Sequence, residues 1–127
     1  MGYKDLKFWQ FLPLLLIITI LSVVLHESSH SIFAKIEGKE VKTGLGVTSF
    51  VSLDEDSNPM EIAIIAMAGP LMNLLLFLIS WRIEKKTGHA FWTIAKNVNL
   101  TLFVLNILPL PGLDGWQFFK NVIKAIA

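Results

Sequence analysis

The sequence contains no cysteine, so neither disulfide bonds nor thiolate metal ligands are available to the chain. It also carries almost no net charge: the formal value of +1 offers no electrostatic footprint for nucleic acid, and we expect no such partner. Internal repeats and low-complexity tracts are missing as well. Apolar residues are abundant, at 54% of 127 residues, and the mean hydropathy is +0.61. This composition predicts a membrane protein.

The apolar residues gather into three long blocks, at about 8–36, 61–81 and 90–108. About 20 apolar residues suffice to cross the roughly 30 Å hydrocarbon core of a bilayer. Prolines and a glycine at 109–112 break the third block, and an amphipathic tail helix is expected at 113–126. We therefore predict one domain, residues 1–127, that is an all-α protein with three transmembrane helices, the third broken near 109–112.

A different pattern separates the first two blocks. Between residues 41 and 53, β-branched and apolar side chains alternate with others, and Gly44 and Gly46 favour a turn or bulge. We expect a small strand or hairpin at the membrane surface. Its edge could receive an unwound substrate as an added strand, or the segment could be a plain connector; the sequence leaves both open.

The first block ends in the residues HESSH, which are unusual in an apolar segment. His26 and His30 are spaced i and i+4, so on a helix both rings project from one face and can share a metal ion. Glu27 lies about 100° around the helix and can reach a water beside that metal without being a ligand. The alternative is a polar patch at a helix end, but ionisable groups are costly in a membrane segment, which favours the metal.

A catalytic zinc usually takes three protein ligands, and the rest of the chain offers few candidates for the third. His89 and the acids at 54–56 and 61 fall in polar loops, where solvated side chains are the simpler interpretation. Asp114 instead lies among apolar residues where the third helix must unwind. Antiparallel spans would bring Asp114 and His26 toward the same membrane face. The competing role for Asp114 is to cap the tail helix.

These residues resemble the three signature motifs of site-2 protease type intramembrane zinc metalloproteases. HESSH, AGPLMN (residues 68–73) and NILPLPGLDG (residues 106–115) follow one another in the family's order over essentially the whole chain. The resemblance implies a three-helix catalytic core in which His26, His30 and Asp114 bind Zn²⁺ and Glu27 is the general base and acid. Cobalt or iron could occupy such a ligand set in vitro.

The resemblance also implies that Asn73 positions the substrate peptide or stabilises the oxyanion, and Asn106 could have a similar role. An alternative for Asn73 is a hydrogen bond between helices, with Gly69 allowing close packing. Family members often have glycine after LDG, whereas Trp116 follows here, which bears on backbone flexibility more than on metal binding. We expect a minimal core without additional regulatory modules.

We therefore predict a zinc endopeptidase that cleaves transmembrane or membrane-proximal peptides, with the lipid bilayer as its surroundings. The alternative is a noncatalytic zinc-containing membrane protein that binds or regulates a partner. Basic residues are divided evenly between the two sides of the membrane and do not set the orientation. The resemblance implies a multi-pass protein with its active site nearer the cytoplasmic face. Whether the chain forms a homo-oligomer stays open.

Overall fold

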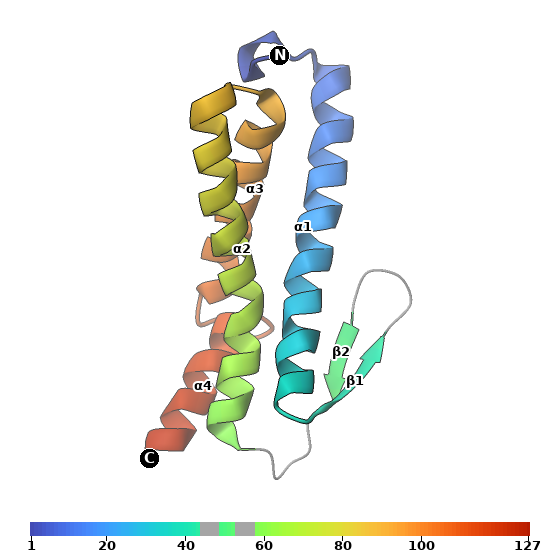
Figure 1. Ribbon diagram of the computed structural model, residues 1–127. Helices are drawn as coiled ribbons and strands as arrows, with labels where there is room; N and C mark the ends of the chain where they lie inside the picture. The colour runs from blue at the N-terminus through green and yellow to red at the C-terminus, as the bar shows by residue number, and fades with distance from the viewer. Residues whose placement is uncertain (44–48, 53–57) are drawn as a thin grey trace.

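The computed structural model describes residues 1–43, 49–52 and 58–127, and its elements are mostly long helices (Figure 1). Along the chain these are a short 3₁₀ helix, Tyr3–Asp5, then α1, Phe8–Ile36; β1, Glu40–Thr43; β2, Ser49–Ser52; α2, Pro59–Thr87; α3, Ala90–Ile107; and α4, Asp114–Ile126. The predicted all-α architecture is confirmed for the four helices. The second helix is longer at both ends than the predicted 61–81.

Helix α2 is the centre of the bundle, because it packs against α1, α3 and α4. Its ends follow from local chemistry. Asn58 caps the start by accepting a hydrogen bond from the Met60 amide, and Pro59 occupies the first helical position, where no N–H is needed. Gly88 ends the helix with φ of 64°, a left-handed conformation that favours glycine. The chain then turns directly into α3, which runs back along α2 (Figure 1).

Strands β1 and β2 form a two-stranded antiparallel sheet beside the C-terminal end of α1 (Figure 1). Their register pairs Glu40 with Ser52 and Thr43 with Ser49. The segment 41–53, for which the sequence predicts a strand or hairpin, falls on these strands. Residues 44–48 and 53 of that segment lie outside the described residues.

The chain breaks between α3 and α4, over residues 108–113, where the prolines of the third block stand. Gly112 takes a φ of 89°, and Gly115 comes so close to the end of α3 that an added Cβ would lie 2.5 Å from the Leu108 carbonyl oxygen. Only glycine therefore allows the first turn of α4 to tuck beneath α3. This close approach fixes the position of Asp114, the first residue of α4.

The interior and the surface of the bundle have an unusual distribution of side chains. Among the described residues, buried positions include histidine, asparagine and serine side chains, whereas many large apolar side chains are exposed. Two of the described helices, α1 and α2, are long and apolar enough to cross a membrane. Helix α3 carries Lys96 and several asparagines and is not among them, so the third predicted crossing stays a prediction.

Candidate metal centre

His26 and His30 lie on the buried face of α1, as their spacing predicts. They are 5% and 8% exposed, and their Nε2 atoms are 3.2 Å apart. One turn of helix separates the two rings, so both Nε2 atoms point toward the same space between α1 and α2. Two neutral imidazole nitrogens in this arrangement are a common half of a zinc site.

Asp114 completes a triangle of ligand atoms. Its Oδ2 lies 2.8 Å from Nε2 of His26 and 3.2 Å from Nε2 of His30, although more than 80 residues separate it from them in the sequence. Ligand bonds of about 2.0–2.1 Å at tetrahedral angles place neighbouring ligand atoms about 3.3 Å apart. The observed separations are close to that value. The three side chains therefore fit a small divalent cation, and Asp114 adds an anionic oxygen to the two nitrogens.

The opposite ring nitrogens are held by oxygen atoms of α2. Nδ1 of His30 donates to the carbonyl oxygen of Ile65 at 2.7 Å, and Nδ1 of His26 donates to Oδ1 of Asn73. Because these oxygens can only accept, each Nδ1 carries the proton, and each Nε2 keeps its lone pair for a metal. The rings thus have the tautomer that metal binding requires.

Gly69 of α2 faces the two histidines at very short range. A Cβ at this position would lie 2.6 Å from Nε2 and 2.7 Å from Cε1 of His26, which no packed side chain tolerates. The sequence suggests that Gly69 allows close helix packing; the structure shows that what packs there is the ligand pair itself. Hydrogen at this position leaves room for both rings.

Glu27 adjoins the ligand triangle from the same helix. One ligand-capable atom from each of His26, Glu27 and His30 lies within 4.8 Å of the others, and the Glu27 side chain is half-buried. Oδ2 of Asp114 is the carboxylate oxygen that lies within 3.2 Å of both histidine Nε2 atoms. The arrangement therefore leaves the Glu27 carboxylate beside the ligand set.

Two asparagines predicted as substrate-positioning residues have different surroundings. Asn73 is fully buried, with its oxygen on His26 and its amide nitrogen donating to Oδ1 of Asn99 at 2.9 Å. Asn106 donates to the carbonyl oxygen of Leu102 within α3. Asn99 itself was not among the predicted site residues. In the sequence, Lys96, Asn99, Phe103 and Asn106 recur at three- and four-residue spacing, which predicts a polar stripe on this helix. The stripe alone does not say which asparagine reaches the site.

Other candidates from the sequence lie away from the triangle. His89 caps α3 by accepting a hydrogen bond from the Phe91 amide, and Glu61 pairs with Lys39 at 3.0 Å. Lys96 pairs with Glu84 of α2 at 2.6 Å. The acids at 54–56 lie outside the described residues.

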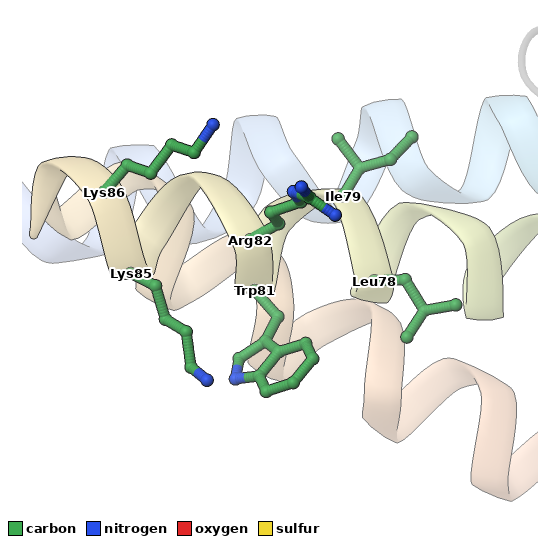
Figure 2. Close-up of a pocket in the computed structure, with 6 residues that line it drawn as sticks. All are labelled: Leu78, Ile79, Trp81, Arg82, Lys85 and Lys86. Atoms are coloured by element: carbon green, nitrogen blue, oxygen red, sulfur yellow. The ribbon is translucent and has the colours of Figure 1, made fainter.

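A hollow of about 600 Å³ opens at the C-terminal end of α2, far from the histidines. Its lining contains Trp81 and three basic side chains, and Lys85 lies over the Trp81 ring at 4.1 Å from the ring centroid (Figure 2). Lys85 is 16 residues after Gly69, which is roughly 24 Å along the helix. None of the six lining residues is a histidine or a carboxylate, so they add no metal ligand to the triangle.

Similar proteins include two named for zinc protease activity. The chain is 34% identical to "Putative zinc metalloprotease sll0528" of Synechocystis sp. over an alignment of 116 residues. The match covers 83% of this chain and 30% of that protein. It is 31% identical over 74 residues to "Putative zinc metalloprotease YwhC" of Bacillus subtilis, covering 47% of this chain and 34% of that protein.

A third relative is "Uncharacterized protein MJ0971" of Methanocaldococcus jannaschii, 37% identical over 75 residues, which covers 51% of this chain and 20% of that protein. No known family model matches the chain. The chain spans about a third or less of the length of these three relatives. It is thus a distant relative of proteins named as zinc metalloproteases, over a part of their length.

Replacing Asp114 with alanine should weaken zinc binding, because it removes one of three converging ligand atoms. We expect about one zinc per chain in the detergent-purified wild type and a loss of affinity in the variant beyond the roughly 10–100-fold typical of residues that only support a ligand. Metal analysis and chelator competition measure this. Asp5→Ala, at the other end of the bundle, is the matched control. Equal zinc affinity in Asp114→Ala and wild type would remove Asp114 from the ligand set.

A methyl group at Gly69 should displace the histidine rings without disturbing the helix. Alanine favours a helix over glycine by about 1 kcal/mol, so the helical circular dichroism of Gly69→Ala should persist while its zinc content falls. Gly2→Ala makes the same change away from the site and should keep its zinc. If Gly69→Ala bound zinc as tightly as wild type, the close approach to His26 would have no bearing on the metal centre.

Proposed function

We propose that this chain contains the catalytic core of an intramembrane zinc endopeptidase of the site-2 protease type, which hydrolyses peptide bonds in transmembrane or membrane-proximal segments. The observation that carries the proposal is the convergence of His26, His30 and Asp114 on one point, with Glu27 beside them. The order of the three sequence motifs and the names of two relatives support it.

The residues of the centre have distinct chemical tasks in this proposal. Zinc, when bound, supplies Lewis acidity that polarises a peptide carbonyl and lowers the pKa of water to about 7. Nε2 of His26, Nε2 of His30 and Oδ2 of Asp114 would hold it. Glu27 accepts a proton from the attacking water as the water oxygen bonds to the carbonyl carbon. It then returns a proton to the amide nitrogen as the C–N bond breaks, leaving an acid and an amine.

The surface of the helices supports a location within a membrane. Only 11% of the most apolar part of α1 is buried, whereas the core helix of a water-soluble protein would be mostly buried. The exposed side chains of α1 include Leu16, Ile17, Ile20 and Leu21. A bilayer would cover these apolar groups, and the polar interior of the bundle would then be the place where water and a substrate peptide meet.

We include α3 as a third crossing in this proposal. It packs antiparallel to α2, and its charged Lys96 is neutralised by Glu84 rather than left alone, which lowers the cost of burying it in the membrane. Three crossings would place the two ends of the chain on opposite sides. By the resemblance, the side of α4, with the metal centre near it, is the cytoplasmic one.

The absence of native cysteine allows a clean test of this topology. In sealed vesicles of known orientation, single cysteines replacing Lys4 and Lys124 should react with a membrane-impermeant maleimide from opposite sides. We expect Lys124→Cys to be labelled from the cytoplasmic side only. Labelling of both variants from the same side would leave two crossings and exclude α3 as a span. Permeabilised vesicles serve as the control for accessibility.

Glu27→Gln should separate catalysis from metal binding. The amide keeps the shape of the side chain but cannot accept the proton, so cleavage of a model single-span substrate should fall by about 10²–10⁴-fold while zinc content stays at the wild-type level. Glu37→Gln, at the end of the same helix, should cleave normally. If wild type bound zinc yet neither it nor Glu27→Gln cleaved any membrane segment, the noncatalytic zinc-binding alternative would replace the protease.

A further inference from the structure

We infer that Asn73, Asn99 and Ser22 form a hydrogen-bonded chain that holds His26 in the tautomer and orientation needed to bind the metal. This inference rests on the proposed zinc site. It makes Asn73 and Asn99 positioning residues that act through His26. It differs from the role implied by resemblance, in which Asn73 contacts the substrate or the oxyanion.

The chain of hydrogen bonds runs through the buried interior and joins three helices. From His26 on α1 it passes to Oδ1 of Asn73 on α2, and Nδ2 of Asn73 donates to Oδ1 of Asn99 on α3 at 2.9 Å. Nδ2 of Asn99 then donates to Oγ of Ser22, back on α1, at 3.0 Å. Asn73 is 0% exposed, and Asn99 and Ser22 are 2% and 4% exposed. Water therefore does not compete for these bonds, which strengthens them.

The direction of each bond determines the direction of the next. Nδ2 of Asn99 also donates to the Ala95 carbonyl oxygen at 2.9 Å. A carbonyl oxygen can only accept, so the amide nitrogen of Asn99 faces Ala95 and its amide oxygen must face Asn73. That oxygen needs a donor, which places the Asn73 nitrogen against it and the Asn73 oxygen against His26. A reversed Asn73 amide would oppose two oxygens at Asn99. The proton of His26 is therefore fixed on Nδ1.

The same geometry limits what else Asn73 can do. Its oxygen is bound to His26, its nitrogen to Asn99, and no part of the residue is exposed. A substrate carbonyl could reach its amide only if the helices separated. Asn73 contacts the candidate metal centre through its hydrogen bond to His26, one of the three candidate ligands.

Zinc affinity of asparagine variants tests this inference with a readout other than cleavage. Asn73→Leu removes the acceptor for His26, and we expect its zinc affinity to fall by about 10–100-fold, as for other residues that orient a metal ligand. Asn73→Asp keeps an acceptor oxygen for His26 but sets a second oxygen against Oδ1 of Asn99, so its zinc affinity should lie between those of wild type and Asn73→Leu. Asn99→Leu should fall between wild type and Asn73→Leu, because it loosens Asn73 without removing the acceptor. Chelator competition measures the affinity, and the visible absorption of the cobalt-substituted protein reports the ligand geometry.

Asn121→Leu is the matched control for these variants. Asn121 is 3% exposed and donates to Gln117 within α4, outside the hydrogen-bonded chain, so its replacement should leave zinc affinity unchanged. The inference would be overturned if folded Asn73→Leu and Asn99→Leu both kept wild-type zinc affinity and an unchanged cobalt spectrum. A folded Asn73→Asp that bound zinc more weakly than Asn73→Leu would overturn it as well.

Milder variants decide the matter if the leucine variants fail to fold. Ser22→Ala removes the last acceptor of the chain and should lower zinc affinity measurably. Ser80→Ala removes another buried hydroxyl from the same small cavity, of about 180 Å³, and should not. Equal affinity in the two serine variants would then refute the positioning role.

The outcomes also separate this inference from the proposed function. If wild type binds zinc and cleaves its substrate while all asparagine variants bind zinc normally, only the positioning role is wrong. If wild type takes up no zinc, the protease proposal and this inference both fail. If wild type binds zinc without cleaving, the affinity measurements still decide the role of Asn73.

Discussion

The imidazole of His26 is the contact on which the rest of the bundle depends. Its two nitrogens are both committed, Nδ1 to Asn73 on α2 and Nε2 toward Asp114 at the start of α4. A buried polar group without a hydrogen-bond partner lowers the stability of the fold by about 1–3 kcal/mol. If the helices shifted along one another, several buried polar groups would lose their partners at once. The polar interior therefore specifies how the helices align, a task that apolar side chains perform poorly when lipid and protein interior are equally apolar.

This arrangement reverses the usual distribution of side chains. The one cluster of buried apolar residues is small and lies near the first half of α1, around Ile18, Ile94 and Ala95, within the described part of the chain. Toward the metal centre the interior becomes polar, and small residues such as Gly69 bring the helices together. Close helix contact and the polar site thus have the same cause. Because Gly69 has no Cβ, the helices can approach each other and the histidine rings have space between them.

The sequence predicts the helices and the shared face of the two histidines well, because both are local properties. Hydropathy marks α1 and α2, the i, i+4 spacing pairs His26 with His30, and the break after the third block singles out Asp114, which the structure brings to the histidines. Contacts between helices are harder to predict. The Ile65 carbonyl has no side-chain signal at all, and Asn99 looks like any other polar residue on α3 until the rotation of α3 about its axis is known.

In the proposed site, metal binding and helix packing would be linked, because the candidate ligands come from different elements. Asp114 is the first residue of α4, whose other side exposes Phe119 and Ile123. A cation bound by Asp114 and the α1 histidines would connect α4 to α1. Its binding free energy would therefore stabilise the packed position of α4. At a hundredfold excess of metal over its dissociation constant, such linkage contributes about 2.7 kcal/mol. The position of α4 depends also on the close approach of Gly115 to the end of α3 and on its packing against α2.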